Sequence, residues 1–455
     1  MTAVDQTAVL EIVSPVDGRP VGSVPVSSRD EISAAFTFAH RAQPVWARTP
    51  AGERGSMLRN AAVRLRAHAD ELADLNRSET GKPREEAREG ALAGAATLEQ
   101  YAELGPVHRG RSLLGDFAAT DLMVPEPRGV VVALTPWNDP VAVACGLLGA
   151  AVVTGNTVVY KPSERCPRTG GLLGEVLAGT FPDGVLQTLH GDGRVGAALA
   201  ARDDFDLIAH VGSTATGRSI AASAAATGAK VLLENGGNDP LVVDEGVDPR
   251  WAAEQAALGS FANAGQICVA VERIYVHQAV AEPFIEALVE QARSHDTPPL
   301  VDTRHRSDVH SQVEDAVSRG ATARTGGEIP SGPGAHYPAT VLTGCAKGMR
   351  VLHEETFGPV APVRVVDTFE QGLAEAADDE YGLAATVLTP SMTHAQHAWR
   401  ELAVGTVKIN AVFGGAPGGA AHPRRRSGTG YGYGPELLDE MTQTKLVHLS
   451  PPGPA

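Results

Sequence analysis

The stretch RGVVVALTPWNDPVAVACGLLGAAVVTGNTVVYKP, residues 128–162, decides the fold class. Residues 129–136 form a short apolar run typical of a buried strand, 140–155 have the length and the small residues of a packed helix, and 156–162 contain a second apolar run. A strand, a helix and another strand in this order are typical of a parallel sheet, because a parallel neighbour needs a long crossover connection.

The same alternation continues along the chain. Further apolar runs, separated by helix-length segments, occur at residues 184–191, 205–213 and 229–237. Apolar runs that alternate with helices predict an α/β fold with a parallel sheet covered on both faces. Amphipathic helical patterns precede this region at 30–104, and a second α/β stretch follows from 240 to about 436.

Composition limits the possible partners and the compartment. The 455-residue chain has 54 acidic and 38 basic residues and a formal net charge of −16, which argues against a nucleic-acid partner. The N-terminus lacks the pattern of a secretory signal, and the longest apolar run, 141–153, is shorter than the roughly 20 residues of a membrane helix. The four cysteines have no CxxC spacing, so we expect no disulfide framework, no metal site and a cytoplasmic location.

A glycine turn follows the apolar run at 205–213. Gly212 and Ser213 open the segment GSTATG, and an Ala-rich helix comes next. Backbone N–H groups at a helix N-terminus bind anions, so the turn is a candidate phosphate site; an ordinary turn with a Ser N-cap is the alternative. Lys161 and Glu164 follow another strand, where open α/β sheets bind ligands. The Glu164 carboxylate there would bind a ribose and repel a 2′-phosphate, which favours NAD over NADP. The alternative is that Lys161 and Glu164 are ordinary surface charges.

The segment FANAGQICVAVERIYV, residues 261–276, contains a single cysteine, Cys268. A free cysteine often serves as a small core residue. Two strand ends favour a reactive role instead: Glu234 precedes a Gly-Gly turn, and Asn138 follows the first apolar run. A carboxylate in a cleft can act as a general base, and an amide can donate to a developing oxyanion. A surface anion and a turn residue are the alternatives for Glu234 and Asn138.

Six motifs occur in order along the chain. They are TPWN (135–138), KPSE (161–164), GSTATG (212–217), LENGG (233–237), GQIC (265–268) and EETFGP (354–359). Together they resemble the aldehyde dehydrogenase superfamily of NAD(P)-dependent enzymes. The resemblance extends over nearly the whole chain, from PVDGRPVGSVPV at 15–26 to SGTGYGYG at 427–434.

The resemblance implies a role for each matching residue. Cys268 matches the catalytic thiol, Glu234 the base that activates water, and Asn138 the oxyanion-hole amide. Cofactor contacts are implied for Thr135, Trp137, Lys161, Glu164, Gly212, Ser213, Glu355 and Phe357. The implied reaction oxidises an aldehyde to the carboxylic acid with NAD+, or with NADP+, through a thiohemiacetal and a thioester that water hydrolyses. It needs no metal.

The resemblance also implies the domain organisation. We expect a Rossmann-like NAD-binding domain from 1–108 and 128–236, an α/β catalytic cysteine domain from 237–436, and a small β oligomerisation arm from 109–127 and 437–455. Such an arm adds strands across a subunit interface, so we expect a homodimer or homotetramer. The other expected partner is a small-molecule aldehyde, with no membrane involved.

Some positions depart from the family's usual pattern. Asp139 stands where an aromatic residue usually lines the substrate tunnel, which favours an aldehyde carrying a hydroxyl or amino group, unless Asp139 turns away to bond a backbone N–H. Asn410 and Phe413 are expected to reach the same tunnel. Arg424–Arg426 form a basic run that either approaches an anionic substrate or a neighbouring subunit, or is a solvated loop.

Two alternatives to a hydrolytic enzyme stay open. A CoA-acylating aldehyde dehydrogenase releases the acyl group to CoA, and then a water-activating Glu234 is unnecessary. A non-catalytic family member keeps the fold without the reaction. The sequence also leaves the physiological direction open, since reduction of an activated acyl group uses the same cysteine.

Overall fold

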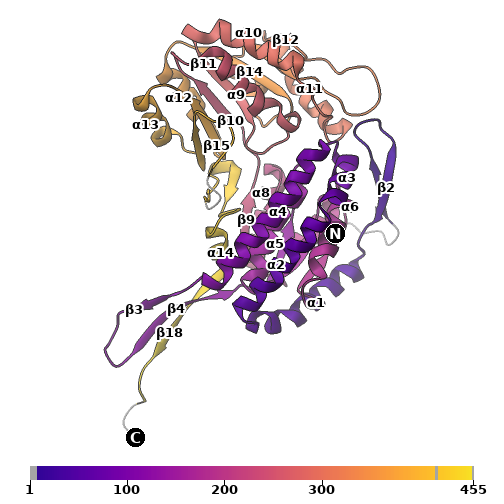
Figure 1. Cartoon of the computed structure of the whole chain (residues 1–455), viewed down its shortest axis with the longest axis vertical. Helices are drawn as coiled ribbons and strands as arrows, with labels where there is room; N and C mark the ends of the chain where they lie inside the picture. Colours follow the sequence, from indigo (N-terminus) through magenta and orange to yellow (C-terminus); the bar gives the residue numbers. More distant parts are fainter. Residues whose placement is uncertain (1–7, 416–418, 453–455) are drawn as a thin grey trace.

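The computed structural model describes residues 8–415 and 419–452. Two mostly parallel sheets with helices on both faces make up the body, and a three-stranded antiparallel sheet projects from it (Figure 1). This architecture confirms the predicted α/β fold class.

The first sheet has the strand order β17-β9-β8-β5-β6-β7, and all neighbours are parallel except β17 and β9. The apolar runs found in the sequence are its parallel strands. The strands are β5 (Val130–Leu134), β6 (Thr157–Lys161), β7 (Leu186–Thr188), β8 (Leu207–Val211), β9 (Lys230–Glu234) and β17 (Gly428–Thr429).

Alternate residues of these strands belong to two different cores. Val131 and Ala133 pack with helices α2 to α6, whereas Val130 and Val132 pack with α1, α7 and α8. Burial of both faces explains why the strands read as continuous apolar runs. The helices are α1 (Arg29–Arg48), α2 (Ala51–Ala67), α3 (Ala69–Thr80), α4 (Arg84–Leu104), α5 (Pro140–Val153), α6 (Pro167–Ala178), α7 (Gly193–Ala200) and α8 (Thr214–Thr227).

The second sheet has the order β12-β13-β14-β11-β10-β15-β16. Helices α9 and α10 cover one face, and α12 and α13 cover the other. Its strands are β10 (Asp239–Val243), β11 (Val271–His277), β12 (Thr322–Thr325), β13 (Thr340–Thr343), β14 (Val360–Val366), β15 (Ala384–Leu388) and β16 (Thr406–Ile409). The helices of this half are α9 (Pro249–Phe261), α10 (Gln278–Ser294), α11 (Thr303–Ser318), α12 (Phe369–Ala377) and α13 (Met392–Glu401).

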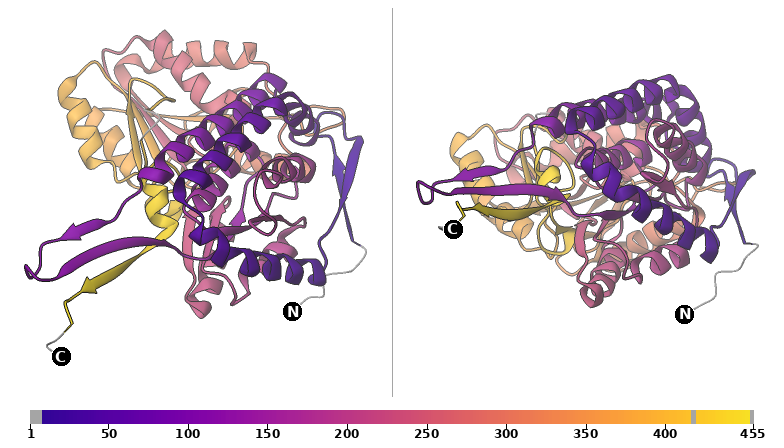
Figure 2. Two further views of the ribbon diagram at one scale, coloured as in Figure 1. Left: turned by 60° about the horizontal axis from the view of Figure 1, so that its bottom comes forward. Right: turned by 90° about the horizontal axis from the view of Figure 1, so that it is seen from below.

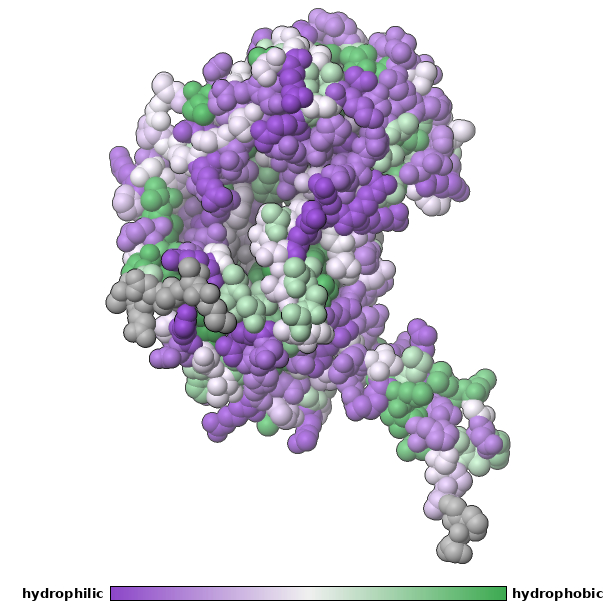
Figure 3. Space-filling model, turned by 180° about the vertical axis from the view of Figure 1, so that it is seen from behind, coloured by the Kyte–Doolittle hydropathy of each residue, from purple (hydrophilic) through white to green (hydrophobic). Residues whose placement is uncertain are grey.

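The projecting arm consists of β3 (Arg111–Leu113), β4 (Thr120–Pro127) and β18 (Thr442–Leu449), with β4 in the centre. Its strands extend away from both sheets, as Figure 2 shows from two further directions. Apolar side chains gather on it (Figure 3), and Leu114, Phe117, Leu446 and Leu449 are exposed. A separate hairpin of β1 (Val9–Val13) and β2 (Pro20–Pro25) lies near the N-terminus.

One short segment crosses back from the second half to the first. Strand β17 lies within the range predicted for the catalytic domain, yet it pairs with β9 in the first sheet, Gly428 opposite Glu234. The helix that follows, α14 (Glu436–Glu440), contributes Leu437 and Leu438 to the core of the first sheet. Among the described residues, no helix has the length and apolar character needed to cross a bilayer.

Candidate active site

A cleft of about 900 Å³ opens at the carboxyl ends of the first sheet and is closed on its other side by loops of the second half. Parallel α/β sheets bind ligands at this edge. The cleft brings together every candidate residue except Asn410 and Phe413. Its lining includes Thr135, Trp137, Asn138, Asp139, Lys161, Glu164, Gly212, Ser213, Glu234, Cys268, Glu355 and Phe357.

Cys268 lies on a strained loop between α9 and β11. Asn263 and Ala264 have φ angles of 47° and 56°, and Gly265 follows at 71°. Left-handed backbone is costly for residues with a Cβ, so neighbouring contacts must hold it. The Gln266 side chain does so: its Nε2 donates to the Asn263 carbonyl at 3.0 Å, and its Oε1 accepts from the Val301 N–H at 2.9 Å.

The thiol faces the predicted base and lies beside the predicted amide. Cys268 Sγ is 3.8 Å from Glu234 Oε1, at the end of β9. Asn138 Nδ2 donates to the Gln266 carbonyl at 3.2 Å, which holds the amide against the cysteine loop. Three segments distant in sequence therefore converge on one sulfur atom.

The surroundings of the thiol disfavour its charged form. Burial raises the pKa of Cys268 well above its usual value, and the nearby carboxylates of Glu234, Asp239 and Glu355 raise it further. Burial also raises the pKa of Glu234, while its contact with the thiol opposes that shift. At neutral pH the free site therefore holds a protonated thiol next to an acceptor for its proton.

The residues around the glycine turn fit a dinucleotide phosphate. Ser213 caps α8 by accepting a hydrogen bond from the Thr216 N–H at 3.3 Å. A Cβ on Gly212 would lie 2.7 Å from His210 Cε1, so the turn has room for backbone only. Thr214 Oγ1, also in this part of the structure, is buried without a hydrogen-bond partner among the described residues. Burial lowers the pKa of His210 to about 4, so the ring is neutral at pH 7.

Lys161 and Glu164 form the neighbouring part of the cleft. Lys161 is buried, its Nζ donates to the Pro162 carbonyl at 2.9 Å, and Glu164 Oε2 lies 3.9 Å away. Burial lowers the pKa of Lys161. The Glu164 side chain stays 43% exposed, which leaves its carboxylate available for a ligand.

Glu355 and Phe357 lie at the other end of the cleft, near Cys268. Glu355 accepts a hydrogen bond from the Gly237 N–H at 3.0 Å, and burial raises the pKa of its carboxyl to about 7. The Phe357 ring lies 5.6 Å from the Trp137 ring, and the His305 ring packs against both. Glu272 fixes this loop by accepting from the Thr356 and Phe357 N–H groups.

The comparisons with known proteins agree with this geometry. A family model described as "Aldehyde dehydrogenase family" matches residues 2–447. The chain belongs to the aldehyde dehydrogenase family. This confirms the family predicted from the six motifs and the prediction of an oxidoreductase that acts on an aldehyde group.

Several characterised members are similar over almost their full length. A betaine aldehyde dehydrogenase of Cereibacter sphaeroides is 34% identical over 469 residues, covering 98% of this chain and 95% of that protein. The lactaldehyde dehydrogenase of Escherichia coli is 31% identical, and its structure matches with a TM-score of 0.95 over 98% of this chain and 96% of that one. A betaine aldehyde dehydrogenase of Staphylococcus aureus in complex with NAD+ is 29% identical, with a TM-score of 0.94 over 98% of this chain and 92% of that one.

Asp139, which departs from the family pattern, does face the cleft. It precedes α5 without forming a side-chain cap, and its Oδ1 lies 3.5 Å from Lys82 Nζ. Lys82 also donates to the Asn138 carbonyl at 3.2 Å, so it supports the amide from behind. Lys82 was not among the predicted site residues; it lies in the segment ETGKP, residues 79–83.

Asn410 and Phe413 do not line this cleft. Asn410 has a φ of 60°, and its side chain bonds both the N–H and the carbonyl of Thr389. Phe413 packs against the core of the second sheet. These contacts fix both residues next to β16, and their role in a substrate tunnel stays a prediction.

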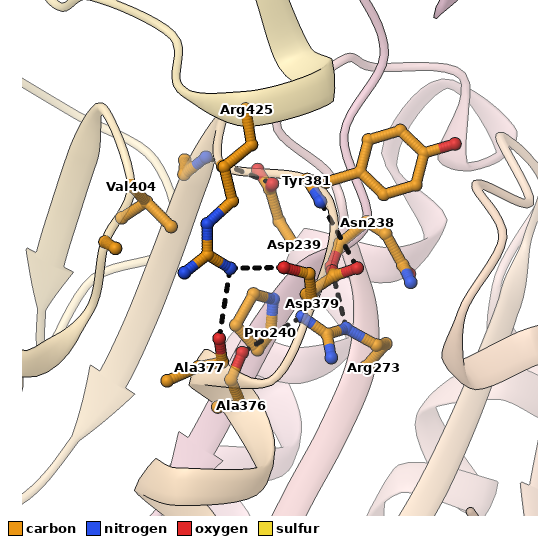
Figure 4. Close-up of a pocket in the computed structure, with 13 residues that line it drawn as sticks. Asn238, Asp239, Pro240, Arg273, Ala376, Ala377, Asp379, Tyr381, Val404 and Arg425 are labelled. Carbon is orange, nitrogen blue, oxygen red and sulfur yellow. Dashed lines mark hydrogen bonds and ion pairs between the residues drawn. The ribbon is translucent and has the colours of Figure 1, made fainter. Parts of the chain in front are cut away.

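The basic run Arg424–Arg426 is exposed to solvent and does not line the cleft, and two of its side chains bond to the protein itself. Arg425 Nη1 donates to the carbonyls of Ala377 and Asp379, and Arg426 pairs with Glu380 at 2.6 Å. Figure 4 shows Arg425 above a small polar pocket beside the buried Arg273–Asp379 pair. Arg273 Nε donates to the Asn238 carbonyl at 2.7 Å, which anchors the loop that follows Glu234.

Several further residues line the cleft, and His210, Arg165, Lys82 and His305 are polar or charged ones that were not among the predicted site residues. His210 ends β8 directly before the glycine turn, and Arg165 directly follows KPSE, so position at a strand end could have identified both. Lys82 lay inside a quoted motif. His305 had no local signal, because it belongs to α11 and reaches the cleft only through the packing of the two halves.

Proposed function

We propose that this family member oxidises an aldehyde to its carboxylic acid with NAD+, using Cys268 as the nucleophile and Glu234 as the base. The observation that carries the proposal is the 3.8 Å approach of Cys268 Sγ to Glu234 Oε1 inside the cleft, with the Asn138 amide held on the same loop. These are the groups that acyl chemistry at a thiol requires: a nucleophile, a proton acceptor and an oxyanion donor.

The reaction begins when the Cys268 thiol transfers its proton to Glu234 and the sulfur attacks the aldehyde carbon. The carbonyl oxygen becomes an oxyanion, to which Asn138 Nδ2 and the Cys268 N–H donate hydrogen bonds. Bound NAD+ supplies the acceptor for the hydride that leaves the same carbon. The oxyanion electrons re-form the carbonyl, and an acyl thioester remains on Cys268.

Hydrolysis then releases the acid. Glu234 first releases the thiol's proton to solvent. It then takes a proton from a water molecule, whose oxygen attacks the thioester carbonyl, and the same oxyanion donors stabilise the second tetrahedral species. The C–S bond breaks, and the sulfur leaves as a thiolate that takes the proton back from Glu234. Because Glu234 serves both proton transfers, its pKa, raised by burial, brings it closer to the working pH of a general base.

The cofactor roles follow the cleft from end to end. Gly212, Ser213 and the N-terminus of α8 hold the phosphates, and Lys161 and Glu164 bind the adenosine ribose. Glu355 binds the other ribose, while Phe357, Trp137 and Thr135 surround the nicotinamide end. Glu164 selects NAD over NADP by repelling a 2′-phosphate.

The decisive experiment is an aldehyde panel followed by the absorbance of the reduced cofactor. It compares wild type with Cys268→Ala, with NAD and with NADP, and with and without CoA. We expect turnover with NAD that needs no CoA and is lost in the variant. An absolute requirement for CoA would instead support the acylating type, and full activity without the thiol would refute the proposal.

We further propose that the aldehyde carries a hydroxyl or amino group. Asp139 lines the cleft with its charge partly balanced by Lys82, and a carboxylate is a poor neighbour for a long alkyl chain. Asp139→Phe should shift the ranking of aldehydes toward alkyl and aromatic ones. An unchanged ranking would remove the substrate proposal and leave the reaction intact.

The remaining proposals concern assembly and location. The arm, 109–127 with 437–455, joins copies of the chain into a homodimer or homotetramer. The NAD-binding domain consists of 1–108 with 128–236, and the catalytic domain of 237–436. Residues 1–7, 416–418 and 453–455 of these ranges lie outside the described part of the structure. The exposed Leu446 and Leu449 support an interface there. Light scattering of Leu446→Lys should show a smaller assembly than wild type. The buried free thiols support a cytoplasmic location.

A further inference from the structure

Three neighbouring strands bring three loops to one edge of the first sheet. Leu134 at the end of β5 lies opposite Lys161 of β6 on one side and His210 of β8 on the other. Arg165, Trp137 and Gly212 follow these strand ends within a few residues. Because adjacent strands are only about 5 Å apart, the three loops share one wall of the cleft.

Arg165 reaches across this cleft. Its guanidinium carbon lies 5.3 Å from the centre of the Trp137 ring, and its Nε lies 3.0 Å from Asp302 Oδ2. Asp302 belongs to the other half of the molecule, where its second oxygen caps α11 by accepting from the His305 N–H at 2.7 Å. The ion pair therefore connects the two walls of the site beside the Trp137 ring.

Two lysines that line the cleft are held by other partners. Lys161 Nζ donates to the Pro162 carbonyl, and Lys82 Nζ donates to the Asn138 carbonyl and faces Asp139. The Arg165–Asp302 pair is partly exposed to solvent, with side chains 27% and 37% exposed, and ion pairs of that kind contribute little free energy. A guanidinium can exchange such a carboxylate for two phosphate oxygens with matching geometry.

We propose that Arg165 binds the pyrophosphate of the dinucleotide, and that Asp302 holds the guanidinium over the cleft until the phosphates replace it. The inference rests on the proposed function, which places the phosphates at the Gly212 turn one strand away. Asp302 is then a competitor for Arg165. Removing the charge of Arg165 should therefore weaken dinucleotide binding, whereas removing the charge of Asp302 should strengthen it.

Isothermal titration calorimetry tests this with NAD, ADP and adenosine. Arg165→Gln should weaken NAD and ADP binding about tenfold, because a charge-assisted contact to phosphate is lost, and leave adenosine unchanged. Asp302→Asn keeps a good N-cap for α11 and removes the competing charge. It should tighten NAD and ADP binding about two- to fivefold, and added salt should weaken NAD binding less in Arg165→Gln than in wild type.

Equal NAD affinity in wild type and Arg165→Gln would overturn the inference, as would weaker binding in both variants, the result expected of a purely structural pair. If Arg165→Gln does not fold, Arg165→Lys keeps a charge without the planar fork and should bind NAD more weakly than wild type but with the same response to Asp302→Asn. Wild type that binds neither NAD nor ADP would instead refute the proposed function itself.

Discussion

Replacing Glu234 with Gln should stop turnover and at the same time make the Cys268 thiol more reactive toward alkylation. Both effects follow from one distance, the 3.8 Å between Sγ and Oε1. In the proposed mechanism the carboxylate accepts the thiol proton, yet in the free protein its charge opposes formation of the thiolate. Burial and Glu234 are the two largest causes of the raised pKa of Cys268. Gln preserves shape and removes the charge.

The size of the effect follows from Coulomb's law. At 3.8 Å, two unit charges interact by about 1 kcal/mol at the dielectric constant of water and about 4 kcal/mol at an effective value of 20. Both groups are half-buried, so the true coupling lies between these values and the thiolate fraction should rise about ten- to a hundredfold. A thiolate with a lower pKa is also a weaker nucleophile, which leaves a net gain of about three- to tenfold.

The assay is the initial rate of iodoacetamide modification against pH, read by intact-protein mass spectrometry. Only Cys268 should react, because Cys145, Cys166 and Cys345 are buried. The alkylation rate of wild type should rise with pH as the thiol ionises, at the high pH that its raised pKa requires. The same rise should occur at lower pH in Glu234→Gln, because the variant thiol has a lower pKa. Cys268→Ala gives the background. A rate in Glu234→Gln equal to or below that of wild type would refute the electrostatic reasoning.

Asn138→Ala should lower kcat/KM about 100- to 1,000-fold in the NADH assay while leaving alkylation of Cys268 unchanged, since an oxyanion donor acts only after attack. Gly265→Ala should lower the free energy of unfolding by about 2 kcal/mol or more, seen as a lower melting temperature. The reason is that φ is 71° and the new Cβ would lie 2.2 Å from the Gly358 carbonyl oxygen. Burial raises the pKa of Asp239 to about 8. The folded protein therefore binds more protons at Asp239 than the unfolded chain does, so the melting temperature should fall as pH rises toward 8. Asp239→Asn keeps the acceptor for the Ala384 N–H but does not titrate, so its melting temperature should depend less on pH.

Sequence reasoning succeeded where a single sheet determines position. The ends of β5, β6, β8 and β9 lie at one edge of one sheet, so Asn138, Lys161, Gly212 and Glu234 had to meet once the apolar runs were recognised as parallel strands. The motif order then added Cys268 and Glu355, which local patterns alone do not bring to that edge.

The sequence says less where position depends on contacts between distant segments. Asn410 follows a strand end, as Glu234 does, but its side chain bonds to Thr389, a contact that local spacing does not predict. Arg425 resembles a solvated cation in sequence, and only the folded chain brings the carbonyls of Ala377 and Asp379 to it. The Arg165–Asp302 pair likewise depends on how the two halves pack, which no local spacing encodes.

The location of backbone strain connects these observations. Within the described residues, non-glycine positive φ angles occur at Asn263, Ala264, Phe357, Asn410 and Arg425. Asn263, Ala264 and Phe357 flank the cleft, where each such residue costs on the order of 1–3 kcal/mol and persists only if its surroundings hold it. Gln266 holds the cysteine loop and Glu272 holds the Phe357 loop. The strained backbone is therefore held in place at Cys268 and at the Phe357 ring, the proposed nucleophile and the proposed nicotinamide contact, before any ligand arrives, which is the arrangement that a positioned attack on a carbonyl requires.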